Sequence, residues 1–297
     1  MKNSKRAIIW IAISFVFLGA LTIVAWLNIH SPAASRFDGN RAYQDVVTQV
    51  DFGPRVPGTP AHQAEVNWLV SQLTSLGWFT EVQTINNESI QILNVIAKRG
   101  KGFPWIILGA HYDSRQYADQ DPNLGNRLKP VPGANVGASG VAVLLELSRI
   151  LPKYPSYQIW LVFFDWEDQG KINNQQWILG SRAFVDTLTQ NPDAAVIIDM
   201  IGDKNLDIYL ERNSDPTLST EIWGIAKDLG YQSTFINKDK YSMLDDHTPF
   251  LEKGIKAIDI IDFDYPYWHT TSDTADKVSA QSLSIVGNTL LKWLQSK

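Results

Sequence analysis

Apolar residues along the chain alternate between short continuous runs and longer stretches with helical spacing. The short runs are rich in β-branched and aromatic residues and predict buried strands at 90–97, 105–109, 158–164, 195–201 and 257–261. Helical spacing predicts helices at 66–76, 138–151, 181–190, 217–229 and 279–295. This alternation predicts a three-layer α/β/α fold, in which helices cover both faces of a mixed, mostly parallel central sheet.

The first apolar run has a different character. Residues 7–27 contain no charged side chain, and as a helix they span about 30 Å, the thickness of a bilayer core. Basic residues precede the run within 1–6, so the positive-inside tendency predicts a single-pass signal-anchor with a cytoplasmic amino terminus. A cleaved signal peptide, with its cleavage region at 31–35, is the alternative. Residues 28–40 then form a linker to an extracytoplasmic domain at 41–297.

Charge and cysteine content narrow the possible partners. Four of the 26 basic residues precede position 37 and none of the 31 acidic residues do, so the rest of the chain carries 22 basic and 31 acidic residues. This balance argues against a nucleic-acid partner. Cysteine is absent, so any metal ion must be held by His, Asp or Glu side chains.

Polar side chains cluster where the predicted strands end. They are, in chain order, His111 and Asp113, Glu167 and Asp168, Asp199, and Asp262 to His269. Asp245 to His247 lie in the sequence between the last two of these clusters. The carboxyl ends of strands in an open α/β sheet meet at one edge, where ligands bind. Carboxylates and imidazoles without thiols suit zinc or a similar divalent ion. The long Pro/Gly-rich connection at 115–137 is also typical of a functional loop.

Each signal taken alone has a structural explanation. His111 and Asp113 fit an ordinary hydrogen-bonded pair as well as a metal ligand with the carboxylate that fixes its tautomer. Glu167 and Asp168 fit a solvated acidic pair, or a proton-transfer group beside a metal ligand. Asp199 ends an apolar run and needs a partner, whether its role is structural or functional. The shared placement of these residues is what favours a site.

Several short motifs follow one another along the chain in a specific order. The order resembles the zinc-dependent aminopeptidase fold and, more closely, the animal-type glutaminyl cyclases (glutaminyl-peptide cyclotransferases) built on it. The resemblance extends over roughly 41–297. The segments that carry it are Arg55–Thr59, Gly109–Ser114, Pro132–Asn135, Phe163–Asp168, Gly180–Arg182, Asp199–Gly202, Asp245–Phe250 and Trp268–Thr270.

The resemblance implies a role for each matching position. Glu167 stands where the family has its general acid/base, and Asp199 and Asp246 match a catalytic hydrogen-bond network. Asp168 and His269 match ligands of a single zinc ion, and Trp268 matches the wall of the substrate pocket. In the two-metal peptidases of this fold, the positions of His111 and Asp199 hold a second metal, and Asp113 would support His111.

One position departs from the pattern. The family has an aspartate ligand directly after Pro-Gly-Ala-Asn, and this chain has Val136 there. Valine has no donor atom, so two protein ligands remain where a catalytic zinc site has three.

The resemblance therefore implies a zinc-dependent acyltransferase that converts the amino-terminal glutamine of peptides or proteins to pyroglutamate and releases ammonia. A zinc metallo-aminopeptidase is one alternative. A membrane-anchored relative that is catalytically impaired by Val136 is the other.

Overall fold

The structure is a computed structural model that describes residues 36–87 and 90–297. The anchor expected at 7–27 lies outside the described residues. Within the described ranges, no helix combines the length and apolar character needed to cross a bilayer. Phe37–Lys297 form one compact unit. The boundary predicted at 41 falls inside its first helix, α2 (Gly39–Asp51).

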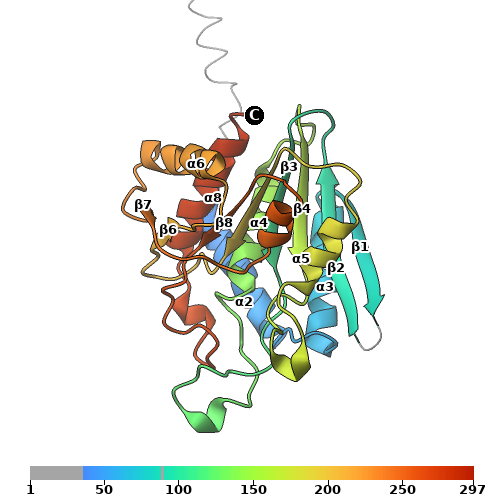
Figure 1. Cartoon of the computed structure of the whole chain (residues 1–297), viewed down its shortest axis with the longest axis vertical. Helices are drawn as coiled ribbons and strands as arrows, with labels where there is room; N and C mark the ends of the chain where they lie inside the picture. Colours follow the sequence, from blue (N-terminus) through green and yellow to red (C-terminus); the bar gives the residue numbers. More distant parts are fainter. Residues whose placement is uncertain (1–35, 88–89) are drawn as a thin grey trace, which may run out of the picture. The chain divides into compact units, whose positions relative to one another are not determined.

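A mixed six-stranded sheet forms the centre of this unit, in the order β1-β2-β4-β3-β5-β8 (Figure 1). The three pairings among β4, β3, β5 and β8 are parallel, whereas β1–β2 and β2–β4 are antiparallel. The strands are β1 (Phe79–Asn87), β2 (Ile90–Arg99), β3 (Trp105–His111), β4 (Gln158–Phe164), β5 (Ala194–Asp199) and β8 (Ala257–Ile261). All five predicted strands are confirmed. The prediction missed β1, an edge strand whose sequence FTEVQTINN has few apolar residues.

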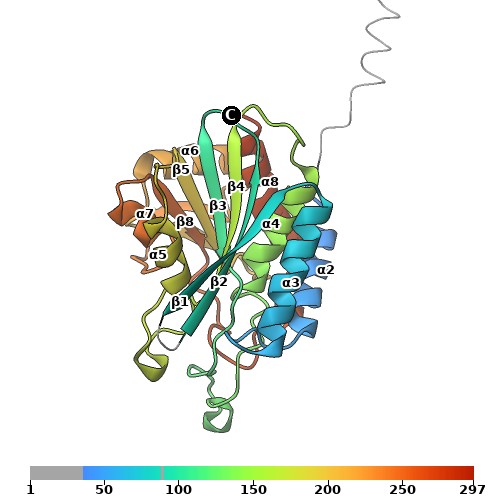
Figure 2. The same cartoon turned by 90° about the vertical axis from the view of Figure 1, so that its right-hand side faces the viewer.

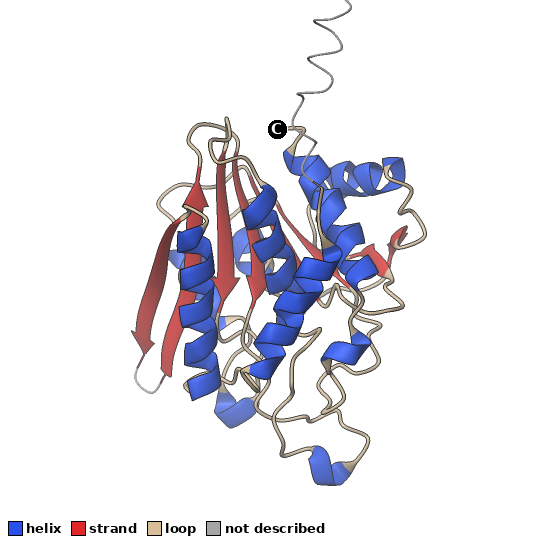
Figure 3. Cartoon of the chain, turned by 180° about the vertical axis from the view of Figure 1, so that it is seen from behind, coloured by secondary structure: helices blue, strands red, loops and turns tan. Residues whose placement is uncertain are grey.

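Helices cover both faces of the sheet, as predicted. Figure 2 shows the sheet between α5 and α7 on one side and α2, α3 and α4 on the other, and Figure 3 shows the larger helical layer from behind. The helices are α3 (Pro60–Ser75), α4 (Ala138–Ile150), α5 (Leu179–Asp186), α6 (Pro216–Asp228), α7 (Thr248–Glu252) and α8 (Ala280–Leu294). Short 3-10 turns occur at Leu124–Asn126, Ile172–Asn174 and Ala275–Lys277.

Successive residues of the central strands enter two different cores, because strand side chains alternate between faces. Ile106 and Leu108 pack in the large core under α4 and α8. Ile107 packs on the opposite face with Phe184 of α5 and Phe250 of α7. Both faces are therefore buried, which explains the continuous apolar runs in the sequence.

The parallel strands fix where the polar segments meet. β3, β4, β5 and β8 run in one direction, so His111, Phe164, Asp199 and Ile261 end at the same edge of the sheet. A small parallel pair, β6 (Ile208–Leu210) with β7 (Phe235–Asp239), flanks β8. The connection after β3 extends from this edge and returns at α4 (Figure 1).

Candidate active site

A cavity of about 130 Å³ lies at the carboxyl edge of the parallel strands. Most of the residues predicted for the site line it: Glu167, Asp168, Asp199, Trp268 and His269, together with Val136. These residues come from the segments after β4, β5 and β8 and from the loop before α4. The topology therefore gathers acids from distant parts of the sequence.

Glu167 is the carboxyl group best suited to proton transfer. Burial raises the pKa of Glu167 well above its usual range, and the nearby carboxylates of Asp168 and Asp245 raise it further. Its side chain keeps a small exposed fraction of 12% toward the cavity. A carboxyl group with a raised pKa is suited to donate a proton as well as to accept one.

His111 lies beneath Glu167 and contacts three carboxylates. Its Nε2 is 3.1 Å from Asp199 Oδ1, and its Nδ1 is 3.4 Å from Asp113 Oδ1 and 4.0 Å from Glu167 Oε2. Burial alone would lower the pKa of His111, but Asp199 and Asp113 outweigh burial, so the pKa is well above its usual value. The imidazolium therefore offsets part of the negative charge of the site.

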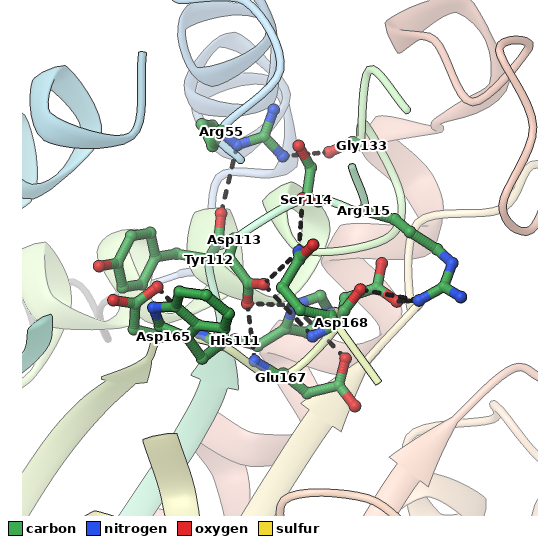
Figure 4. A network of polar contacts seen from close by, with 12 residues as sticks. Arg55, His111, Tyr112, Asp113, Ser114, Arg115, Gly133, Asp165, Glu167 and Asp168 are labelled. Carbon is green, nitrogen blue, oxygen red and sulfur yellow. Dashed lines mark hydrogen bonds and ion pairs between the residues drawn. The ribbon is translucent and has the colours of Figure 1, made fainter. Parts of the chain in front are cut away.

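Asp113 holds the segment that carries the acids (Figure 4). Its buried carboxylate accepts hydrogen bonds from the backbone N–H groups of Glu167 and Asp168, at 3.0 and 3.3 Å, and from Gln169 Nε2 at 3.0 Å. The sequence predicted only its contact with His111. The structure adds that Asp113 positions the backbone on which Glu167 and Asp168 stand.

Arg55 performs the same function for the neighbouring loops. Its buried guanidinium donates hydrogen bonds to the carbonyl oxygens of Tyr112, Pro132 and Gly133. Gly133 has φ +72°, and a Cβ there would come within 2.7 Å of this guanidinium. Arg55 thus joins the end of β3 to the loop that delivers Val136.

Asp273 fixes the backbone of that loop from the other side. Its buried carboxylate accepts hydrogen bonds from Asn135 N at 2.8 Å and Val136 N at 3.2 Å, and also from the Tyr265 hydroxyl at 2.7 Å. The backbone at Val136 is therefore held by its amide, whatever side chain it carries.

Three residues at the edge of the site have left-handed backbone conformations. They are Trp166, Met200 and His269, with φ values of 53°, 49° and 54°. A bulky residue in this region costs on the order of 1–3 kcal/mol and persists only where its surroundings hold it. One of the three directly precedes Glu167, one directly follows Asp199, and the third is the predicted metal ligand. The strain is thus located at the functional segments.

Asp168 and His269, the predicted metal ligands, contact each other. His269 Nε2 is 2.9 Å from Asp168 Oδ1, and His269 Nδ1 is 3.3 Å from Asp119 Oδ1. A carboxylate behind the distal nitrogen is the usual support of a metal-binding histidine. Arg115 also approaches Asp168, with Nη1 3.6 Å from Oδ1. Asp119 and Arg115 both lie in the loop at 115–137, which the sequence singled out only by its length.

The donor set does not complete a catalytic zinc site. Val136 is buried and contributes an apolar wall to the cavity, together with Met200 and Ile261. In the part of the chain that the structure describes, no three His, Asp or Glu side chains are arranged to hold a metal ion. Asp168 and His269 supply two donors, whereas a catalytic zinc site has three protein ligands. Zinc at these two residues stays a prediction.

The structure places Asp245 rather than Asp246 at the cavity. Asp245 lines it, and burial raises the pKa of Asp245 to about 6. Asp246 lies behind it, fully buried, and burial together with Asp245 raises the pKa of Asp246 well above its usual range. Both acids belong to the same charged group, but sequence alone could not decide which of two adjacent residues faces the cavity.

Aromatic and apolar side chains form the remaining wall. The Trp268 ring stacks on His269, with 3.7 Å between ring centroids, and contacts Phe263 edge-on at 5.2 Å. Trp177 also lines the cavity, as do Met243 and Leu244. The sequence predicted a pocket role only for Trp268 among these residues, because the others lie on loops without a distinguishing pattern. The cavity therefore offers an acidic side to an ammonium group and an apolar side to a small side chain.

Residues 94–294 match peptidase family M28, and the chain belongs to this family. Its relatives include both cyclases and peptidases. A glutaminyl-peptide cyclotransferase from Bos taurus is 24% identical over 336 residues, covering 93% of this chain and 90% of that protein. The glutaminyl cyclase of Porphyromonas gingivalis superposes with a TM-score of 0.84 at 34% identity, covering 89% of this chain and 99% of the other. A structure described as a Zn-dependent exopeptidase from Parabacteroides distasonis superposes with a TM-score of 0.82 at 30% identity, covering 89% of this chain and 100% of the other.

Proposed function

We propose that this protein binds the amino terminus of a peptide in the acidic cavity and converts an amino-terminal glutamine to pyroglutamate. The observation that carries the proposal is the position of Glu167, a mostly buried carboxyl with a raised pKa that faces the same cavity as Trp268 and Asp199. Relatives of similar length and fold that are described as glutaminyl cyclases support it.

The chemistry needs one proton-transfer group and a fixed geometry. The α-amine nitrogen of the glutamine attacks its own γ-carbonyl carbon, a new C–N bond forms, and the bond to the side-chain nitrogen breaks to release ammonia. Glu167 takes a proton from the attacking amine and delivers it to the leaving nitrogen. Both reacting groups belong to one residue, so holding that residue in a reactive conformation supplies much of the acceleration.

The other predicted residues orient the substrate and the proton. Asp199 and Asp245 face the position of the α-amine and attract its ammonium form. The ammonium group loses one proton to this group of carboxylates before the neutral amine attacks, and that proton leaves with the ammonia. Trp268 and Phe263 pack against the glutamine side chain. Asp246 keeps Asp245 and the surrounding acids in a shared buried network, in which protons are exchanged within a small group of carboxyls.

The decisive experiment measures ammonia release and loss of the free amine from a Gln-initiated peptide, with and without added zinc. We expect both signals from the natural chain and neither from Glu167→Gln, which keeps the shape of the side chain and removes the proton-transfer group. Release of a free amino-terminal residue would instead identify an aminopeptidase.

Val136 favours a second candidate function, binding of peptide amino termini without turnover. In this candidate, the site with one donor fewer would lack the Lewis acid that polarises a carbonyl in zinc enzymes, while the acidic and aromatic walls remain. This candidate predicts that a Gln-initiated peptide binds by calorimetry, that its amino-acetylated form does not, and that neither releases ammonia.

We further propose that residues 7–27 anchor the protein in a membrane, with the amino terminus in the cytoplasm. The uncharged apolar run and its basic flank support this topology. Protease treatment of intact cells or spheroplasts tests it, because only an external domain is degraded without lysis.

A further inference from the structure

A second cavity lies on the other side of the segment that carries Glu167 and Asp168. It has a volume of about 350 Å³, larger than the first. Trp166 and Gln169 line it, whereas the two residues between them line the first cavity. The two cavities therefore share a wall made of four consecutive residues.

The lining of this second cavity contains no charged side chain. Four carboxamides, Gln116, Gln169, Asn173 and Gln175, alternate with the apolar surfaces of Trp166 and other residues. A carboxamide carries both a donor and an acceptor, which matches the donor and acceptor of each peptide unit. In a protein rich in acids, a neutral cavity of this kind fits an uncharged chain of peptide groups better than an ion.

Several hydrogen bonds hold the shared wall in place. Gln169 Nε2 donates to Asp113 Oδ2 at 3.0 Å and to Ser114 O at 2.9 Å, and Gln169 Oε1 accepts from Gln116 N at 3.3 Å. The Trp166 indole N–H donates to Gln91 O at 2.8 Å. The cavity is thus preformed, which lowers the entropic cost of binding.

Two of the carboxamides remain available to a ligand. Across the described residues, no hydrogen bond involves the side-chain amides of Asn173 or Gln175, and both side chains reach solvent. Asn173 has φ 50°, in a turn whose ends are joined by the bond from Lys171 N to Gln175 O at 2.8 Å. The turn presents both amides at the cavity without using them internally.

We propose that this second cavity binds the backbone of the peptide residues downstream of the amino terminus held in the first cavity. The proposal rests on the proposed function and deepens it, because it makes affinity depend on peptide length. An extended peptide advances about 3.3 Å per residue, so a longer peptide reaches farther from the first cavity than a dipeptide does.

The experiment compares the affinities of two peptide probes that have no charged side chain. The Glu167→Gln variant is used so that no cyclisation occurs during the titration. The probes are Gln-Gly amide and Gln-Gly-Ser-Ala-Ser-Gly amide, which carry the same charge. We expect the longer peptide to bind on the order of tenfold more tightly, because it adds neutral hydrogen bonds to the carboxamides. We expect Asn173→Ala with Gln175→Ala to abolish this gain and leave the affinity of the short probe unchanged.

Asn237→Ala serves as the matched control, since Asn237 is an exposed asparagine on β7 outside both cavities. It should keep the full length dependence. This inference is overturned if the two probes bind the Glu167→Gln variant with equal affinity, or if the longer probe still binds more tightly after the double substitution. Either result leaves the proposed role of the first cavity unchanged. Failure of both probes to bind overturns the proposed function as well.

Discussion

Replacing Val136 with aspartate tests whether one side chain separates this protein from a three-ligand zinc site. Val136 is 2% exposed, and burial of a valine side chain stabilises a fold by about 1.5–3 kcal/mol. Val136→Asp loses most of that and places a carboxylate beside Asp168, Asp199 and Glu167. Without metal, we expect the free energy of unfolding of Val136→Asp to fall by about 3–5 kcal/mol, since a buried unpaired charge is costly.

Zinc should reverse this loss in the variant. Metal that binds only the folded state at 1,000 times its dissociation constant stabilises by about 4 kcal/mol. With about 2–4 °C per kcal/mol for a domain of this size, the melting temperature of Val136→Asp should rise by roughly 10 °C between EDTA and zinc. The natural chain, with two donors, should change far less.

The assay is thermal unfolding in EDTA and in zinc, combined with metal analysis of the dialysed protein. Val136→Asn is the matched control, because asparagine resembles aspartate in shape and polarity but has no carboxylate. It should be destabilised and gain little from zinc. Two results would refute the reasoning: stoichiometric zinc in the natural chain, or no zinc response in Val136→Asp.

Three further substitutions test the supports of the site. Asp113→Asn should lower the free energy of unfolding by about 2–4 kcal/mol, because the amide cannot accept all the hydrogen bonds from the Glu167 segment; denaturant unfolding measures this. Arg55→Met should cost about 3–5 kcal/mol in the same assay, because buried carbonyl groups lose their donors. Burial raises the pKa of Glu65 to about 8, so its protonated form stabilises the fold at low pH and this contribution is lost as pH rises from about 4.5 to 8. Glu65→Gln should therefore flatten the stability profile in that window, raising stability at pH 9 relative to the natural chain.

Each of these has a result that contradicts it. An Asp113→Asn protein with unchanged stability would show that the backbone of the Glu167 segment is held by other contacts. A mild effect of Arg55→Met would mean that water can replace the guanidinium. A pH profile that keeps its slope in Glu65→Gln would assign the titration to another buried acid, for which Asp262 is the first choice because burial raises its pKa to about 7.

The sequence predicted the central strands well because both of their faces are buried, so apolar residues follow one another without interruption. It missed β1, which is an edge strand with exposed polar residues and Phe79 facing solvent at 65% exposure. It also placed α2 partly in a linker. The sequence did not predict the rest of α2 as a helix, although Ala42 and Val46 are buried at helical spacing, and its start depends on the Asp38 side chain accepting from Asn40 N and Arg41 N.

The candidate site was predictable where chemistry follows a strand directly. Glu167, Asp168 and Asp199 lie within a few residues of strand ends, so parallel topology brings them together. Asp119 and Arg115 were not predictable, because their contacts with His269 and Asp168 depend on how a long loop returns to the sheet. The choice between Asp245 and Asp246 depends on one turn of backbone that no periodic pattern encodes.

Asp273 accepts hydrogen bonds from the backbone amides of Asn135 and Val136. The backbone at this point of the cavity is therefore held independently of the side chain at position 136. A residue whose main chain is tethered from outside can be exchanged with little displacement of its neighbours. Position 136 is therefore a suitable site for changing the ligand preference of the cavity. Acidic, amide or hydroxyl side chains introduced there would offer different donor atoms on the same backbone.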